Sequence, residues 1–328
     1  MQTEELGEHL SDLLNTSVEV EKVTLLAGGA SKEVWKVEGA TPEESLDLLV
    51  RRAAGGEIYS DTLSLEQEYQ VLQAAYEAGV KVPKPYGYFE DLDGREAFVM
   101  ERLEGESIGR RLVRKEEFES TREALPQRLA EELSRIHAVP LESLPSLPGA
   151  QSEPATDYNL ESLERELDLL EEPHPAIELG LSWLREHVPA SHGVVLNHGD
   201  FRIGNFLVSE EDLVGVVDWE FAHLGDPAED LGWPLVRAWR FGEDHLRLGG
   251  IGEVEPFLER YNSLTGREIS KEELFYWEVL GNVRWAIGSH NQAQRHLSGQ
   301  EPSVELAILG RLAAEVEYEI LSLLERGG

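Results

Sequence analysis

The hydrophobic pattern of the chain changes near residue 102, and this change limits what the chain can fold into. Before this point, short segments alternate apolar and polar residues, which is typical of strands in a half-buried sheet. After it, most apolar residues recur every three or four positions, as in amphipathic helices. A chain of 328 residues, of which 41% are hydrophobic, can bury a sizeable core. The pattern therefore predicts two lobes, one built on a sheet and one mostly helical.

Four strands and one helix are expected in the first lobe. Residues 18–24 and 33–37 form a predicted hairpin, because the Gly-Gly pair in AGGAS (27–31) is a turn signal. The third strand is LDLLVRR, and EAFVMERL (96–103) is a buried fourth strand. SLEQEYQVLQAAYEAG (64–79) predicts a helix that stops at its glycine.

Long amphipathic helices are expected in the second lobe, with one short β-rich segment at 193–219. The segment MERLEGE connects the lobes, so we assign residues 1–103 to the first lobe and 104–328 to the second. A ligand cleft between two such lobes is the default expectation. The predicted helices span residues 125–139, 160–172, 176–188, 253–264, 271–296 and 303–326.

A His, an Asp, an Arg and an Asn crowd into residues 198–205 of LNHGDFRIGNF (196–206), between the apolar segments VVLN and FLVS. A loop held by strands at both ends is a rigid place for chemistry. Asp200 and Asn205 lie in this loop, and the next predicted strand, LVGVV, leads to Asp218. Carboxylate and amide oxygens are hard ligands that suit Mg²⁺ together with phosphate oxygens.

The order H-x-D-x-x-x-x-N with a later Asp is the arrangement that phosphoryl transfer requires. One Asp orients or deprotonates the acceptor hydroxyl, while the Asn and the second Asp hold Mg²⁺ on the nucleotide phosphates. His198-Gly199-Asp200 stands where protein kinases carry H-R-D, and Asp218-Trp219-Glu220 where they carry D-F-G. The alternative is structural: Asp and Asn form turns or cap helices, but turn chemistry does not ask for these residue types together.

The segments HGDFRIGNFLV and VVDWEFAHLGDPAEDLGW strongly resemble the aminoglycoside phosphotransferase family of kinase-like small-molecule phosphotransferases. SLEQEYQVL, FVMERLEGES and GNVRWAIGSHNQAQRHLSG are similar to the subgroup that includes the kinase-like domain fused to some acyl-CoA dehydrogenases. The resemblance implies an α+β, protein-kinase-like fold. A small antiparallel-sheet N-lobe with one main helix would precede a larger helical C-lobe. It also implies ATP- or GTP-dependent phosphorylation of a hydroxyl group on a small molecule.

By this resemblance Asp200 is the catalytic base, and Asn205 and Asp218 are the Mg²⁺ ligands. His198 would buttress the loop through hydrogen bonds. Gly199 replaces the arginine of H-R-D, which fits an enzyme that activation-loop phosphorylation does not switch.

The resemblance also places the nucleotide in the N-lobe. Gly28, Gly29 and Ser31 occupy the phosphate-loop position, although the segment is not G-x-G-x-x-G and reads equally as an ordinary hairpin turn. The backbone carbonyl of Glu101 and the amide of Leu103 would bind the nucleotide base.

A cation for the phosphates is expected from the third strand, where Arg51 takes the place of the usual lysine. Alternation puts Arg51 on one face with Leu49, opposite Leu48 and Val50. Its expected partner is Glu68, which falls within the apolar stripe of the helix and therefore needs a cation. The alternatives are an Arg51 on an exposed edge strand and a Glu68 on the rim of the helix.

The segment GDPAEDLGW reads as scaffold. Asp226 would cap a helix, Glu229 would complete a capping box and Asp230 would lie in the first turn. Acceptor-pocket candidates by position alone are Trp233, Arg284, Trp285 and His290. Because the stretch from 281 to 296 contains no carboxylate, the acceptor is expected to be neutral or anionic, such as a hydroxylated acyl-CoA, alcohol or sugar.

The charge balance excludes some partners. Sixty-four Asp and Glu against 29 Lys and Arg give a net charge of −35, which argues against nucleic-acid binding. No apolar run could span a membrane, and the acidic start lacks a signal-peptide pattern, so a cytoplasmic location is expected. With no cysteine, disulfides and thiolate metal sites are excluded.

Three functions follow. The favoured one is an ATP- or GTP-dependent, Mg²⁺-assisted kinase acting on a small-molecule alcohol. The first alternative is a non-catalytic nucleotide-binding protein of the same fold, because an arginine stands where the lysine is usual. The second is an antibiotic-resistance phosphotransferase for aminoglycosides or macrolides. The oligomeric state is left open.

Overall fold

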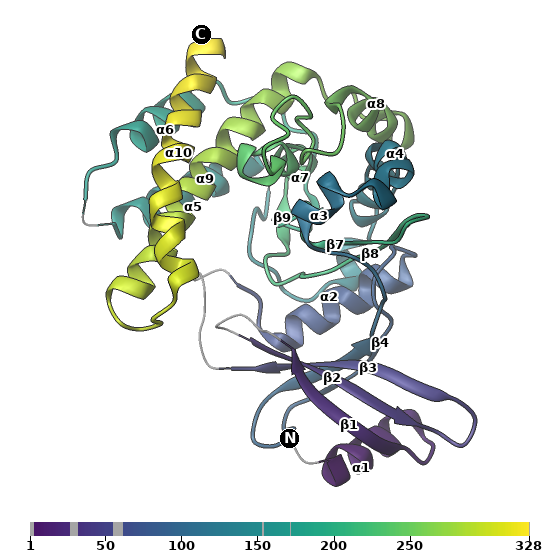
Figure 1. Ribbon diagram of the computed structural model, residues 1–328. Coiled ribbons are helices and arrows are strands. Elements are labelled where there is room, and N and C mark those ends of the chain that lie inside the picture. Colours follow the sequence, from purple (N-terminus) through teal and green to yellow (C-terminus); the bar gives the residue numbers. More distant parts are fainter. Residues whose placement is uncertain (1–2, 27–31, 55–61, 153, 171, 328) are drawn as a thin grey trace.

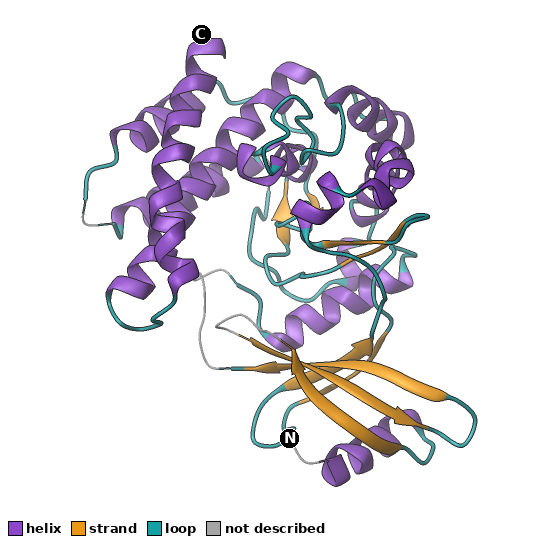
Figure 2. Cartoon of the chain, in the orientation of Figure 1, coloured by secondary structure: helices purple, strands orange, loops and turns teal. Residues whose placement is uncertain are grey.

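The computed structural model describes residues 3–26, 32–54, 62–152, 154–170 and 172–327. It has the expected α+β architecture of two lobes. Figure 1 shows the N-terminal sheet at one end of the molecule and the helices of the second lobe at the other. Figure 2 shows that nearly all long strands gather in the first lobe.

The N-lobe is built on a five-stranded antiparallel sheet in the order β1-β2-β3-β5-β4. The sequence did not predict β4, because its two nearby prolines read as a break. Pro85 is the first residue of this edge strand, where a missing N–H removes no bond from the interior of the sheet. The strands are β1 (Glu19–Leu26), β2 (Lys32–Ala40), β3 (Ser45–Ala53), β4 (Pro85–Phe89) and β5 (Ala97–Glu101).

Two helices cover opposite faces of this sheet. The first, α1 (Thr3–Leu14), was not predicted and buries Leu6 and Leu10 against one face. The second, α2 (Leu65–Glu77), begins with a capping box at Ser64 and packs its apolar stripe on β4 and β5. Leu48 and Val50 of β3 belong to the core under α1, as the predicted alternation requires. Leu49 and Arg51 therefore face the other lobe.

All six predicted helices of the second lobe are present, with shifted ends, and α4 begins earlier than expected. The longest, α9, packs against α5, α6, α10 and the short helix α7 (Pro227–Gly232), and forms the centre of the lobe. No helix among the described residues is long and apolar enough to cross a membrane. The six helices are α4 (Glu119–Ile136), α5 (Ala155–Asp168), α6 (Pro175–Glu186), α8 (Val254–Thr265), α9 (Lys271–Leu297) and α10 (Val304–Gly327).

The predicted β-rich segment at 193–219 contributes to two short two-stranded ribbons, where the sequence predicted one. Strand β6 (Val195–Asn197) pairs with β9 (His223–Gly225), which lies beyond the predicted segment. Strand β7 (Phe206–Val208) pairs with β8 (Leu213–Val216). The loop that contains Asp200 runs between the two ribbons.

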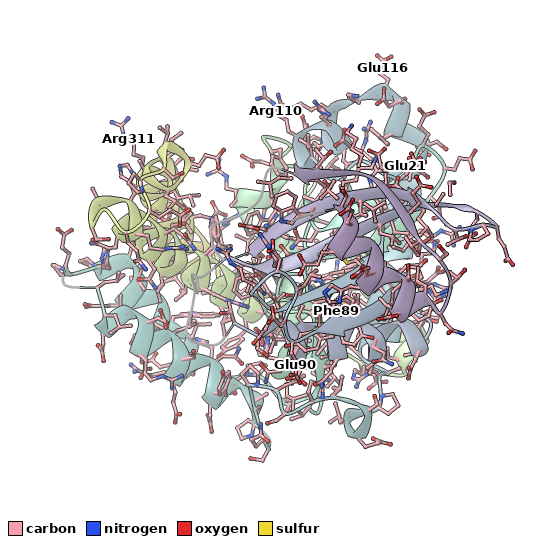
Figure 3. All side chains as sticks on the ribbon, turned by 90° about the horizontal axis from the view of Figure 1, so that it is seen from below. Glu21, Phe89, Glu90, Arg110, Glu116 and Arg311 are labelled. Atoms are coloured by element: carbon pink, nitrogen blue, oxygen red, sulfur yellow. The ribbon has the colours of Figure 1, made fainter. Side chains whose placement is uncertain are left out.

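Charged side chains cover the outside of both lobes. Glu21 on the sheet, Glu116 and Arg110 near α3 (Gly109–Arg114), and Arg311 on α10 are exposed and point outward in Figure 3. The net charge of −35 therefore keeps the surface well hydrated.

Candidate active site

Asp200 is held in one orientation by three side-chain donors. It is 7% exposed and lies between β6 and β7. Its Oδ1 accepts the indole N–H of Trp233 at 2.7 Å and Nε of Arg202 at 3.0 Å. Its Oδ2 accepts Nδ2 of Asn205 at 2.6 Å. Donors to both oxygens fix the orientation of this carboxylate, as general-base chemistry requires.

His198 links Asp200 to the segment after β8 that carries Asp218. Its Nδ1 accepts the backbone N–H of Asp200 at 3.2 Å, so the neutral ring carries its proton on Nε2. That proton is donated to the carbonyl of Val217 at 3.1 Å, directly before Asp218. Burial lowers the pKa of His198, which favours this neutral form. The contacts agree with a buttressing role and leave the ring no free nitrogen for proton transfer.

Asp230 of helix α7 (Pro227–Gly232) anchors the start of the loop that contains Asp200. Its carboxylate accepts the backbone N–H groups of His198 at 2.6 Å and Gly199 at 3.0 Å. Gly199 has a φ of +78°, and a Cβ there would lie 2.1 Å from the carbonyl oxygen of Phe221. This position therefore accepts only glycine, which explains why the chain cannot carry the arginine of H-R-D.

The scaffold predictions for α7 are confirmed in one part and wrong in another. Asp226 caps the helix by accepting the N–H of Ala228 at 2.9 Å. Glu229 does not complete a capping box, because a fully buried carboxylate is better stabilised by cations and amides than by one backbone N–H. It contacts four side chains instead: Asn159 at 2.8 Å, His223 at 3.2 Å, Arg284 at 3.3 Å and Asn197 at 3.5 Å.

Asp218 combines an unusual backbone with a cationic neighbour. Its φ is +71°, in the left-handed region that side chains rarely adopt. Its side chain is 34% exposed and lies 2.9 Å from Nη2 of Arg51. Burial raises the pKa of Asp218, but Arg51 outweighs this effect and holds the pKa below its ordinary value. Strain of this kind is concentrated at functional sites.

Arg51 and Glu68 form the predicted pair. Strand β3 lies inside the sheet and the Arg51 side chain is 12% exposed, so the edge-strand alternative is wrong. Glu68 is 3% exposed, so the rim alternative is also wrong. Nε of Arg51 lies 3.1 Å from Oε1 of Glu68, and its Nη2 lies 3.3 Å from Oε2 of Glu220. Arg52 points to the other face, where it pairs with Glu33.

Lys32 is the site residue that sequence reasoning missed. It is the first residue of β2 and is 9% exposed. Its Nζ lies 2.7 Å from Oε2 of Glu68 and 3.1 Å from Oε2 of Glu220. The period of two that places Val34 in the cleft also points Lys32 inward, and this signal could have identified it.

A cavity of about 350 Å³ lies between the lobes above these charges. Arg51, Glu68, Asn205 and Asp218 form its polar end. Leu103 also lines it, two residues after the end of β5 at Glu101. Gly28, Gly29 and Ser31 lie outside the described residues. The apolar walls of the cavity include Leu26, Val34, Leu49, Phe98, Met100, Leu207 and Trp219.

The oxygen atoms at the polar end of the cavity are of the kind that ligates a hard cation. Nδ2 of Asn205 is engaged with Asp200, which leaves its Oδ1 as the ligand atom. The N–H of Val217 donates to the carbonyl of Asn205 at 2.9 Å, so Asn205 is tied to the residue before Asp218. An amide oxygen and a partly exposed carboxylate in one cavity suit Mg²⁺.

Three of the four acceptor-pocket candidates belong to an aromatic cluster beside Asp200. The guanidinium of Arg284 lies 4.9 Å from the ring centre of Trp233, which contacts Asp200. Trp239 lies 5.6 Å from Trp233 and 4.7 Å from Trp285. Arg202 lies 4.4 Å from the Trp239 ring centre, which adds a second cation to the cluster.

His290, the fourth candidate, lies apart from this cluster. Its Nε2 contacts Glu317 of α10 at 3.1 Å. Residue 290 lies six positions beyond Arg284 on the same helix, which moves it about 9 Å along the axis at the rise of an α-helix.

Comparison with known sequences gives one family. The model of the phosphotransferase enzyme family matches residues 22–269. Acyl-CoA dehydrogenase family member 10 of Mus musculus is 28% identical over 291 residues, which cover 81% of this chain and 26% of that protein. Acyl-CoA dehydrogenase family member 11 of Gallus gallus is 30% identical over 294 residues, which cover 83% of this chain and 37% of that protein. The chain thus spans roughly a quarter to two fifths of these relatives.

Comparison with solved structures gives the same fold. A candidate aminoglycoside phosphotransferase from Ralstonia eutropha JMP134 superposes with a TM-score of 0.78 at 21% identity, covering 99% of this chain and 98% of that one. Spectinomycin phosphotransferase in complex with ADP and spectinomycin superposes with a TM-score of 0.63 at 15% identity, covering 97% and 98%. At these identities the likeness establishes the kinase-like fold.

Proposed function

Because the chain belongs to the phosphotransferase enzyme family, we propose that it transfers the γ-phosphoryl group of ATP or GTP to a hydroxyl group of a small molecule. The observation that carries the proposal is the setting of Asp200. Three donors fix its carboxylate, and Asn205 connects it to the cavity that also contains Asp218. This is the base-and-metal arrangement that phosphoryl transfer uses.

In the proposed reaction the carboxylate of Asp200 orients the acceptor hydroxyl and receives its proton. The acceptor oxygen attacks the γ-phosphorus, and the bond from this phosphorus to the bridging oxygen of the β-phosphate breaks, which releases ADP or GDP. Asn205 and Asp218 would hold Mg²⁺, which supplies charge stabilisation to the phosphates. His198 stays neutral and keeps the loop in place.

The N-lobe, residues 1–103, would bind the nucleotide. Gly28, Gly29 and Ser31 would contact phosphates, and the backbone of Glu101 and Leu103 would bind the base. Arg51 and Lys32 would meet the α- and β-phosphates. Two cations here face three carboxylates, those of Glu68, Asp218 and Glu220, so anionic phosphates need an accompanying Mg²⁺.

The C-lobe, residues 104–328, would bind the acceptor beside Asp200. Arg202 and Arg284 lie against the tryptophans of this region. Each of these arginines is paired with a carboxylate, Asp200 or Glu229, and no carboxylate lies between residues 281 and 296, so we expect a neutral or anionic acceptor rather than a polycationic antibiotic. An unchanged inhibitory concentration for aminoglycosides and macrolides, measured in a sensitive host that expresses the protein, is therefore expected.

The test is a screen of hydroxylated metabolites for a nucleotide-dependent mass gain of one phosphate. With the acceptor in hand, Asp200→Asn should lower kcat by a factor of about 10² or more. Lys32→Met should instead raise KM for the nucleotide. Asp244→Asn, an exposed carboxylate paired with Arg237, is the matched control. Undiminished turnover in Asp200→Asn would show that this residue is not the base.

A second candidate, nucleotide binding without catalysis, is favoured by one observation. Arg51 already occupies Oδ1 of Asp218, the expected metal ligand. Calorimetry with ATP and Mg²⁺ separates the two functions. Binding without transfer to any acceptor or to water would favour the non-catalytic protein.

A further inference from the structure

Two histidines and a glutamate meet where three helices of the C-lobe join, apart from the proposed catalytic residues. His174 precedes α6, His290 lies on α9 and Glu317 lies on α10. Nδ1 of His174 and Nε2 of His290 are both 3.1 Å from the same oxygen, Oε1 of Glu317. Figure 1 shows α6, α9 and α10 side by side at this end of the molecule.

The three side chains offer one ligand atom each, and these atoms lie within 4.8 Å of one another. No other group of three His, Asp or Glu residues in the described part of the chain has its ligand atoms this close. In a tetrahedral zinc site, bonds of about 2.0–2.1 Å place neighbouring ligand atoms about 3.3 Å apart. The two 3.1 Å separations at Glu317 therefore match the edges of such a site.

Burial and packing hold the ligands in place. The side chain of His174 is 9% exposed, and its ring centre lies 4.0 Å from that of His290. His290 and Glu317 are about one quarter exposed, at 23% and 24%. The site is therefore open on one side, where water can reach a fourth coordination position.

The ligand types distinguish the ion. Imidazole nitrogens suit zinc and other late first-row metals, whereas Mg²⁺ prefers an all-oxygen shell. A His₂Glu set with one open position is an established zinc geometry. We propose that His174, His290 and Glu317 bind one Zn²⁺ ion, which fastens α10 to α6 and α9. This site is independent of the proposed phosphotransferase activity.

The test is calorimetric titration of the chelator-treated, full-length chain with ZnCl₂, in excess Mg²⁺ to occupy oxygen-rich sites. One Zn²⁺ per chain is expected. His290→Gln and Glu317→Gln should each weaken its affinity by about tenfold or more. Co²⁺ should give the visible absorption bands of a four-coordinate site, and these bands should disappear in the same variants.

Matched controls lie on the same helices. His187→Gln at the opposite end of α6, and Glu315→Gln two residues before Glu317, should leave both readouts unchanged. Far-ultraviolet circular dichroism confirms that each variant is folded. Two outcomes would overturn the proposal. Either the wild-type chain binds no Zn²⁺ above the level of the His290→Gln, Glu317→Gln double variant, or the single variants bind it as tightly as the wild type.

Discussion

At the scale of single residues, the site depends on a few side chains that hold Asp200 and Asp218. The indole of Trp233 donates to the proposed base at 2.7 Å and is 6% exposed. A charge-assisted hydrogen bond in such a setting contributes about 1.5–3 kcal/mol. Trp233 is thus a positioning residue whose N–H can be removed while most of its ring is kept.

Trp233→Phe should lower kcat about tenfold or more and leave KM for the nucleotide nearly unchanged, because the base loses its orientation while the nucleotide cavity is untouched. Steady-state kinetics with the acceptor measures both constants. Trp183→Phe is the control, since Trp183 lies on α6 and stacks on His187, outside the cluster beside Asp200. Equal losses in both variants would contradict this role for the Trp233 N–H.

Residue-level prediction from sequence succeeded where a pattern constrained the side chain. Glu68 lies in an apolar helical stripe and Arg51 on the inner face of a strand, and these positions require the pair to be buried together. The place of Lys32 in the site was not predicted, because its partners Glu68 and Glu220 are distant in sequence. The contacts of Glu229 escaped for the same reason, since a local capping rule cannot weigh distant cations.

At the scale of elements, α4, α7 and α8 meet at a buried histidine. His137 follows α4, with its Nε2 3.4 Å from Asp230 of α7 and its Nδ1 2.7 Å from the hydroxyl of Tyr261 on α8. Burial lowers the pKa of His137 below its ordinary value, although Asp230 opposes the shift. The folded protein therefore binds a proton here less readily than the unfolded chain.

This lowered pKa predicts a pH dependence of stability. The contribution of neutral His137 to the free energy of unfolding is fully present above the unfolded pKa of histidine, about 6.5. It is lost as the pH falls toward the pKa of His137 in the folded protein. The free energy of unfolding should thus fall with pH below about 6.5, by up to about 1.4 kcal/mol per pH unit for this one group. Urea unfolding of the wild type and His137→Gln at several pH values measures the difference.

His137→Gln should reduce this slope, because glutamine keeps hydrogen-bonding atoms but does not titrate. His245→Gln, in an exposed turn, is the control and should leave the slope as in the wild type. His223 acts in the opposite direction: burial lowers its pKa, but Glu229 outweighs this and raises it. A wild-type slope retained in His137→Gln would show that other groups cause the acid sensitivity.

Elements were predictable where apolar periodicity extended over several turns or strand residues. The six long helices and four strands of the sheet follow from it. Strand β4 could not be predicted, because two prolines read as a break until the edge position of Pro85 is known. Strand β9, of three residues, is too short to show a period and exists through its pairing with β6.

At the scale of the whole molecule, the lobes meet through charges as well as apolar contacts. Arg51 of the sheet bridges to Asp218 and Glu220 of the second lobe, and the main hydrophobic core runs from α2 into the helical lobe. Sequence predicted the two lobes and the loop, since both are local patterns. It could not predict that Lys32 and Arg51 share the same carboxylates, because only the folded chain brings them together.

The left-handed backbone of Asp218 affects the trade-off between stability and the proposed activity in this chain. A side chain at φ +71° costs about 1 kcal/mol or more relative to glycine, and this cost lowers the stability of the folded protein. Asp218→Gly should therefore unfold at a higher temperature than Asp218→Ala while having equally little phosphotransferase activity, and thermal unfolding of both variants measures this. A lower unfolding temperature in Asp218→Gly would contradict it. Selection for stability alone would replace this aspartate, so its presence is what the proposed phosphoryl transfer requires: a position where the chain gives up stability for the proposed chemistry.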